Sequence, residues 1–201
     1  MDKIDICNMA LSRLGVELIE SLNEASEPAR VCSQFYNQAR RVVLRRYNWT
    51  FATRRSELAL LPTTIPDYLY AYRYPAGCEF VRKLYNKDCD NIPAYTEYKL
   101  GSDSEGRIIY TDVENAVAEY TADIEDCGLF DSQFTEMLSW KLAEEMAFKL
   151  TGNMQIAQMA ESQYNNLYLE AVANSEDEQN LKGADPYTFA GARFSGLDGE
   201  M

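Results

Sequence analysis

The chain has 201 residues, of which 46% are apolar and 25% charged, as is usual for a globular protein with one sizeable core. Its formal net charge of −13 argues against general nucleic-acid binding, because most of the surface would repel a phosphate backbone. Histidine is absent, which removes the commonest general base and the commonest metal ligand and makes catalysis less expected.

The chain begins MDKIDICNMA, which is acidic from its second residue and does not have the pattern of a signal peptide. No apolar run approaches the roughly eighteen residues that a membrane span needs. We therefore expect a protein that is made and used in a cytoplasm. The cysteines are odd in number, widely spaced and without a C-x-x-C pair, which predicts free, buried thiols at Cys7, Cys32, Cys78, Cys89 and Cys127.

Two helices are predicted at the start of the chain. Apolar residues at spacings of three and four indicate a helix over 2–14, which Gly15 would end in a left-handed conformation. The second is predicted from an N-cap at Ser26 to about Tyr47. Its core side would consist of Cys32, Phe35, Tyr36, Ala39, Val42 and Val43, and its opposite side of Arg30, Gln34, Asn37, Arg41 and Arg45.

Basic residues concentrate at the end of this second helix. Six of the nineteen stand in three doublets within positions 40–55: Arg40, Arg41, Arg45, Arg46, Arg54 and Arg55. We predict that the first four contact a neighbouring subunit, because a basic face opposite an acidic face fixes orientation. Two alternatives stay open: a solvated face with local ion pairs or tyrosine stacking, and contact with passing DNA.

The middle of the chain, residues 49–126, is rich in Tyr, Thr, Pro and Gly and has no sustained helical period. It predicts short strands at 56–61, 68–75, 79–86, 94–101, 107–113 and 116–124, separated by prolines and polar turns. Residues 97–112 predict a hairpin. Large aromatic residues stand where the second helix leads into the first strand, and we predict that Trp49 and Phe51 are structural.

Helical periodicity returns after the strands. Asp131 is a candidate cap of a helix that Gly152 would end, with Phe134, Leu138, Leu142 and Met146 in one row. A fourth helix is predicted from Asn153 to about residue 180. The predicted class is α+β, mainly α: a four-helix bundle (1–48 and 127–180) with a strand-rich insertion (49–126) and an extended C-terminal tail (181–201).

No nucleotide-binding, hydrolase or metalloprotease motif is present, so we predict no catalytic residue, cofactor or metal. Glu144-Glu145 and 176–178 carry adjacent carboxylates, which can act as acid and base when they are buried together. We expect both groups to be exposed on the polar sides of their helices. The stretch DCDN at 88–91 lacks the remaining ligands of a calcium loop.

The last twenty-one residues combine small residues with aromatic ones, whereas a solvating terminus is normally poor in aromatics. We predict that this tail docks on another protein through Leu181, Tyr187, Phe189 and Phe194. Folding back on the bundle and simple disorder are the alternatives.

The order of these features resembles a known family. The N-terminal part of the chain resembles the tail tubular protein A family, the head-to-tail adaptors of short-tailed bacteriophages. The shared features are a helix that ends LxxLG, a loop with the residues IESL, a long helix that begins with an acidic residue and alanine, and the residues WTF before a strand that ends LL. The resemblance covers roughly residues 5–62 and depends on the combination of Leu11, Leu14, Gly15, Ile19, Ser21, Leu22, Ala29, Arg40, Trp49, Thr50, Phe51, Leu60 and Leu61.

The resemblance implies a non-enzymatic structural protein of the virion neck that forms a ring, a dodecamer in that family. One side would bind the portal protein through the C-terminal tail, and the other the tail nozzle, tail tubular protein B. Double-stranded DNA would pass through the ring only transiently during genome ejection, and assembly would take place in the host bacterial cytoplasm. Two alternatives belong to other classes: a small cytoplasmic protein-interaction module and a histidine-free hydrolase based on the carboxylates.

Overall fold

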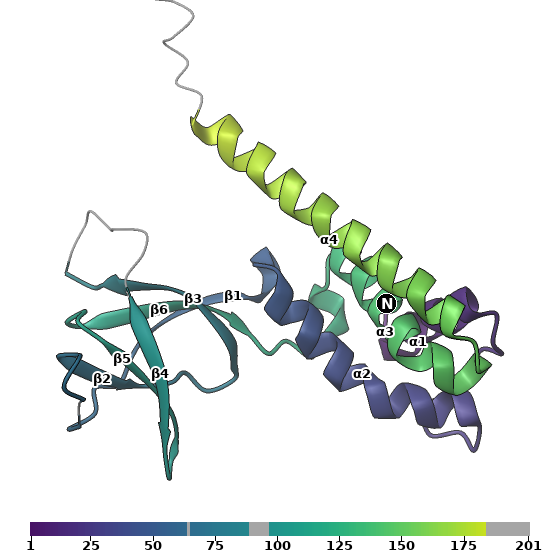
Figure 1. Cartoon of the computed structure of the whole chain (residues 1–201), viewed down its shortest axis with the longest axis horizontal. Coiled ribbons are helices and arrows are strands. Elements are labelled where there is room, and N and C mark those ends of the chain that lie inside the picture. The colour runs from purple at the N-terminus through teal and green to yellow at the C-terminus, as the bar shows by residue number, and fades with distance from the viewer. Residues whose placement is uncertain (64, 89–96, 184–201) are drawn as a thin grey trace, which may run out of the picture.

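The computed structural model describes residues 1–63, 65–88 and 97–183. It has a helical part and a β part, joined at the C-terminal end of the second helix (Figure 1). The helices are α1 (Lys3–Leu14), α2 (Glu27–Arg46), α3 (Ser132–Thr151) and α4 (Met154–Gly183), and all strands lie between α2 and α3. The predicted class, four helices with a strand-rich insertion after the second, is confirmed.

The helix ends lie close to those that the sequence predicts, except that Asp2 caps α1 instead of belonging to it. Ser26 and Asp131 accept hydrogen bonds at the starts of α2 and α3, and Asp2 forms a reciprocal capping box at the start of α1. Gly15 and Gly152 end α1 and α3 at φ values of 67° and 66°. Glycine adopts this left-handed conformation without the clash that a Cβ would cause, so each helix stops at a defined residue.

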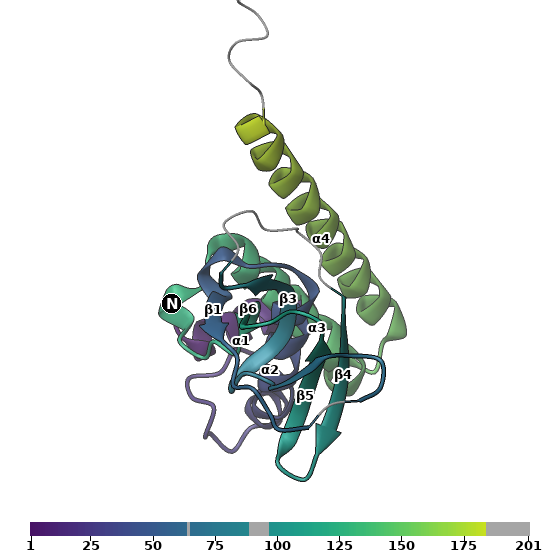
Figure 2. The same ribbon diagram turned by 90° about the vertical axis from the view of Figure 1, so that its left-hand side faces the viewer.

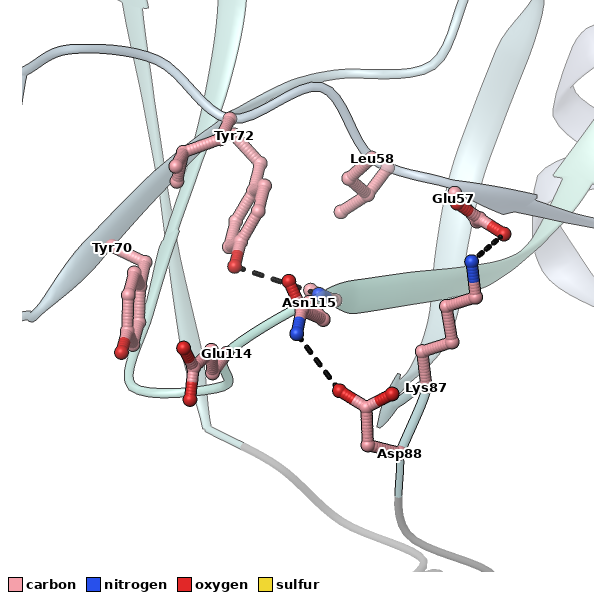
Figure 3. A pocket seen from close by; sticks show the side chains of 10 residues that line it. Glu57, Leu58, Tyr70, Tyr72, Lys87, Asp88, Glu114 and Asn115 are labelled. Carbon is pink, nitrogen blue, oxygen red and sulfur yellow. Dashed lines mark hydrogen bonds and ion pairs between the residues drawn. The ribbon is translucent and has the colours of Figure 1, made fainter.

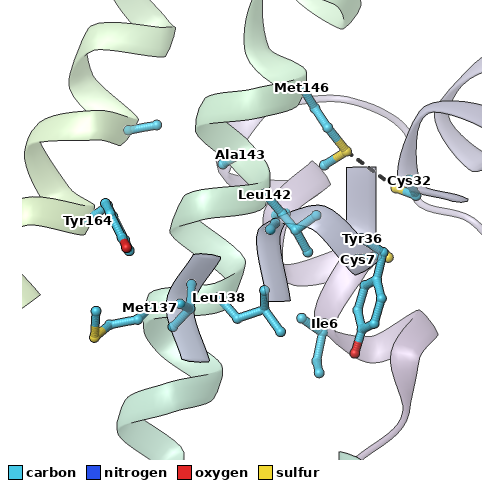
Figure 4. Packing of buried hydrophobic residues seen from close by; sticks show 14 of the residues in the cluster. Ile6, Cys7, Cys32, Tyr36, Met137, Leu138, Leu142, Ala143, Met146 and Tyr164 are labelled. Carbon is cyan, nitrogen blue, oxygen red and sulfur yellow. Dashed lines mark hydrogen bonds between the residues drawn. The ribbon is translucent and has the colours of Figure 1, made fainter. Parts of the chain in front are cut away.

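Helix α3 is the centre of the helical part. It packs against α1 and α2 on one side and against α4 on the other, and its buried residues cover most of its circumference (Figure 4). Leu138, Leu142 and Met146 meet Ile6 of α1 and Tyr36 of α2 in one continuous core. A helix that is apolar on nearly all sides is a core helix, which is why α3 has no broad polar face.

The buried side of α2 is rotated from the predicted one. Four of the six predicted core positions are buried: Cys32, Tyr36, Ala39 and Val43. Phe35 is half-buried, and the prediction was wrong for Val42, which is 36% exposed. Arg40 and Leu44 are buried instead: Arg40 donates to Ile124 in the chain that leaves the insertion, and Leu44 belongs to the bundle core. This rotation decides what the arginines do.

The insertion consists of two three-stranded antiparallel sheets with the orders β1-β6-β3 and β2-β5-β4. The strands are β1 (Thr53–Glu57), β2 (Tyr70–Arg73), β3 (Cys78–Asn86), β4 (Tyr98–Asp103), β5 (Gly106–Thr111) and β6 (Ala116–Ala122). Val81, Leu84 and Ala118 of the first sheet pack with Ile109 of the second and form a small separate core. The predicted hairpin is confirmed as β4 and β5.

The first strand starts earlier than predicted. The prediction of a strand over 56–61 was wrong, because β1 is Thr53–Glu57 and pairs with β6. Residues after Leu58 leave this sheet and reach the other one, where Leu60 forms an isolated bridge with Tyr72. One apolar segment thus spans two sheets, which a local pattern of alternation does not reveal.

Helix α4 extends beyond the rest of the helical part (Figures 1 and 2). Its N-terminal part packs on α3 through a narrow stripe that includes Ala160, Tyr164 and Ala171. The rest of the helix runs away from the bundle, so that its C-terminal end lies apart from the other helices (Figure 1). The molecule is therefore elongated, with the insertion at one extremity and the end of α4 at another.

Candidate functional site

Arg40 is fully buried where α2 meets the insertion. Its Nη1 group donates to a carboxylate oxygen of Asp123 and to the carbonyl oxygen of Ile124, 2.5 Å away. Its Nη2 group lies 3.6 Å from Glu125 Oε1. These partners follow β6, so one guanidinium connects the helix to the segment that leads out of the insertion.

The next two arginines of the helix connect it to the same region from the outside. Arg41 Nη2 lies 2.9 Å from Asp123 Oδ2, and its Nε lies 3.4 Å from Glu79 Oε1. Arg45 donates to the backbone carbonyl of Glu79 at 3.1 Å and places its guanidinium 5.6 Å from the ring centre of Phe80. Both side chains keep exposed surface, so these contacts are weaker than that of Arg40.

The carboxylate of Asp123 forms ion pairs with two guanidinium groups, those of Arg40 and Arg41. Its burial alone would raise the pKa, but the hydrogen bonds and charges of Arg40 and Arg41 outweigh this effect and lower the pKa of Asp123. The carboxylate is therefore held in its charged form, which a buried arginine requires.

Arg82 of β3 completes the connection. It donates to the carbonyl oxygens of Leu44, Arg45 and Tyr47 at 3.1, 2.9 and 2.6 Å, and to the hydroxyl of Thr121 at 2.8 Å. The last carbonyls of a helix have no partner within the helix, and α2 ends without a glycine that would satisfy them. Arg82 is not among the residues predicted from the sequence, and the absence of glycine after α2 was the signal that could have pointed to such a donor.

We call this group the arginine junction; it consists of Arg40, Arg41, Arg45, Arg82, Glu79 and Asp123. It orients the insertion relative to the bundle, because its polar contacts join α2 to β3 and to the segment that follows β6. Local ion pairing, one of the alternatives for the basic face, thus describes Arg40 and Arg41. Arg40 has no exposed surface, so the prediction that its side chain contacts a neighbouring subunit does not fit the structure.

Arg46 connects α2 to a different element. It donates to Asn165 Oδ1 at 2.9 Å, and its guanidinium carbon lies 4.8 Å and 4.3 Å from the ring centres of Tyr164 and Tyr168. Cations and tyrosine rings attract each other at this distance. Arg46 therefore attaches the end of α2 to α4 and stacks on tyrosine. This contact agrees with the alternative of a basic face with local ion pairs or tyrosine stacking.

The third doublet lies on β1. Arg55 forms an ion pair with Glu119 of β6, with its Nε 2.7 Å from Oε2, and Glu119 also accepts from the Tyr85 hydroxyl at 3.0 Å. Arg54 donates only to nearby backbone carbonyls, at 3.0 and 2.9 Å. Arg55 thus shields a buried carboxylate on the outer face of the sheet.

Trp49 and Phe51 pack in the bundle core at the start of the insertion. Trp49 is 2% exposed and donates from Nε1 to the carbonyl oxygen of Val43 at 2.9 Å. Phe51 is half-buried and contacts Phe130 and Phe134 at ring-centre distances of 5.6 and 5.1 Å. Such positions fit the structural role predicted for both residues.

The adjacent carboxylates of α3 are less exposed than the sequence suggested. Lys141 lies between them, 2.8 Å from Glu144 and 3.0 Å from Glu145, and each carboxylate side chain is 23% exposed. Burial would lower the pKa of Lys141, but its bonds to both carboxylates raise it. One lysine thus forms ion pairs with two carboxylates of the same helix. Such pairs stabilise a helix and do not by themselves indicate proton transfer.

The predicted docking residues of the tail lie mostly beyond the described part of the chain. Leu181 belongs to α4, which continues to Gly183, and Tyr187, Phe189 and Phe194 lie outside the described residues. Their predicted contact with a portal therefore stays a prediction.

Other kinds of site are scarce in the part of the chain that the structure describes. No group of three or more acidic or cysteine side chains there is arranged to hold a metal ion, and no described helix is long and apolar enough to cross a membrane. Four cysteines are free thiols, Cys7, Cys32, Cys78 and Cys127, and Cys89 lies outside the described residues. Comparison with models of known families and with curated proteins finds no match.

Proposed function

We propose that the protein is a structural, non-enzymatic ring subunit, the head-to-tail adaptor of a short-tailed bacteriophage. It would join the portal protein to the tail nozzle and surround the passage of the DNA. The observation that carries the proposal is that several residues of the resemblance over 5–62 have a structural role. Among them Leu11, Ile19, Arg40 and Trp49 are buried, and Gly15 ends α1.

The loop between α1 and α2 gives a second argument of the same kind. Asn8 of α1 donates to the carbonyl oxygen of Ile19 and accepts from its N–H group, both at 2.9 Å. This pair fixes the IESL text against the first helix and buries Ile19. Ile19, one of the residues that carry the resemblance, thus has a defined place in the local structure, which supports a family relation.

The shape of the chain also suits a ring. A closed ring needs two different surfaces on each subunit, one that fits the other on the next subunit. The elongated molecule, with the insertion and the far half of α4 at separate extremities, offers such surfaces (Figures 1 and 2). Arg41, Arg45 and Arg46 keep exposed surface for a neighbour. An acidic ring would not hold DNA by its phosphates, so the DNA could slide.

The proposal is tested by mixing the purified full-length chain with the portal protein of the same virus. Light scattering after size exclusion gives the mass of the assembly, and negative-stain electron microscopy gives its shape. We expect closed rings, or rings that form on the portal. A chain that stays monomeric and does not bind the portal would support the alternative of a small interaction module.

A further inference from the structure

A pocket of about 330 Å³ opens at the end of the insertion where the chain crosses from one sheet to the other (Figure 3). The segment after β1 and the turn between β5 and β6 form its sides. It is lined by Glu57, Leu58, Leu60, Tyr70, Tyr72, Lys87, Asp88, Glu114, Asn115 and Ala116. None of these residues belongs to the arginine junction.

Two tyrosines of β2 form one wall of the pocket. Tyr70 and Tyr72 project from the same side of the strand, with ring centres 6.2 Å apart. Tyr72 is buried and donates from its hydroxyl to the carbonyl oxygen of Val113 at 2.9 Å, so its ring is fixed. Tyr70 is only half-buried and presents part of its ring to the opening.

Glu114 provides a carboxylate beside this wall. It lies next to Tyr70 at the opening (Figure 3), it is exposed, and among the described residues it has neither a hydrogen-bond nor an ion-pair partner. The other charged groups of the lining are occupied. Lys87 lies 2.6 Å from Glu57, and Asp88 accepts a hydrogen bond of 2.8 Å from Asn115.

The charges of the lining favour a cation. Glu57 and Lys87 neutralise each other, whereas Asp88 and Glu114 leave two negative charges around the opening. A carboxylate beside a tyrosine face is a favourable environment for a guanidinium group, which can pair with the acid and stack on the ring. A phosphate would be repelled by the same charges.

The turn that carries Glu114 has a defined conformation. Asn115 has a φ of 49° and is the only non-glycine residue with a left-handed backbone in the part of the chain that the structure describes. Its carbonyl oxygen accepts from the N–H group of Lys87 at 3.1 Å, and its side chain binds Asp88. These contacts connect the turn to the end of β3 and hold Glu114 at the pocket before any ligand arrives.

We propose that this pocket binds the guanidinium group of an arginine side chain presented by a protein partner, with Glu114 as its ion-pair partner and Tyr70 as its stacking surface. A protein is favoured over free arginine for two reasons. Leu60 of the lining and Leu69, which precedes Tyr70 in the chain, are 61% and 71% exposed and offer apolar contact to a partner backbone. The free amino acid also carries a carboxylate, which the acidic opening repels.

The probe is N-acetyl-arginine amide, which presents the side chain without terminal charges. The isotope-labelled chain is titrated with this probe and followed by NMR. N-acetyl-citrulline amide serves as a neutral probe of the same shape, and free arginine tests whether the ligand is the free amino acid instead of a protein side chain. We expect the arginine amide to shift the amide signals of Tyr70 and Asn115. We also expect it to bind about tenfold more tightly than the citrulline probe, since a charge-assisted pair is lost in the latter.

Two variants separate the pocket from general charge attraction. Glu114→Gln should weaken binding of the arginine amide about tenfold, whereas Glu17→Gln, which removes one exposed charge from the helical part, should leave it unchanged. Equal binding of the citrulline probe, equal effects of the two variants, tighter binding of free arginine, or shifts away from the pocket would each overturn the proposal. The test uses the single chain, so its outcome is independent of ring formation.

Discussion

Arg40 of α2 and Asp123, the first residue after β6, form an ion pair in which the guanidinium has no exposed surface. The pair joins two segments that lie 83 residues apart along the chain. The pair connects α2 to the segment that leads out of the insertion, and it leads to the first two predictions.

Replacing Asp123 by alanine should lower the free energy of unfolding by about 3–5 kcal/mol, because the charge of Arg40 would stay buried without its partner. Chemical unfolding followed by circular dichroism measures the change. Glu125→Ala is the matched control, since its side chain is 65% exposed, and should cost less than about 1 kcal/mol. Equal effects of the two substitutions would show that burial of the pair contributes nothing.

The same pair predicts a dependence of stability on pH. The pKa of Asp123 in the folded protein is lowered from its ordinary value of 3.8, so the charged carboxylate stabilises the folded protein. This contribution is complete above the unfolded pKa and is lost as the pH falls through the lower, folded pKa. The stability difference between the parent and Asp123→Asn should therefore shrink as the pH falls through the ordinary value of 3.8 and below it. A constant difference over this range would contradict the assignment.

Replacing Trp49 by alanine should cost about 3–5 kcal/mol, because it leaves a cavity in the bundle core and removes the hydrogen bond to Val43. Thermal and chemical unfolding measure the loss. Leu69→Ala, at a side chain that is 71% exposed, should change stability by less than about 0.5 kcal/mol. If the Trp49 variant melts like the parent but fails to assemble, the residue belongs to an interface.

Reversing Arg41 and Arg45 to glutamate tests the predicted contact with a neighbouring subunit of the ring. Position 41 faces Glu79 and Asp123, so a glutamate there would add like-charge repulsion. We expect a lower melting temperature as well as impaired assembly. Assembly must therefore be scored below the melting point of the variant. Normal assembly together with lost, salt-dependent DNA affinity would assign the face to DNA instead.

Deleting residues 182–201 should leave the bundle folded, because the core residues of α4 among those whose burial the structure describes, Ala160, Tyr164 and Ala171, all precede this point. The melting temperature should stay within a few degrees of the parent value, whereas binding to the portal should be lost. Co-purification with the portal tests the second part, and a truncated chain that still joins the portal would refute docking by the tail.

The sequence by itself determined the elements and their order. Helix ends depend on residues only a few positions away, so a local pattern predicts them. Examples are the caps Ser26 and Asp131 and the glycines at 15 and 152. The apolar row of α3 is local in the same way. The hairpin of β4 and β5 could be predicted because a short turn joins its strands.

Only the tertiary structure decided which arginines are buried and what they bind. Arg40 and Arg41 look alike in the sequence, yet one is inaccessible and the other half exposed, because residues 123–125 return to one side of α2 from a distant strand. Arg82 caps a helix that ends 36 positions earlier, and Glu114 meets Tyr70 only because β5 pairs with β2. Such partners are set by pairing between distant strands, and a one-residue change of register would alter every one of them.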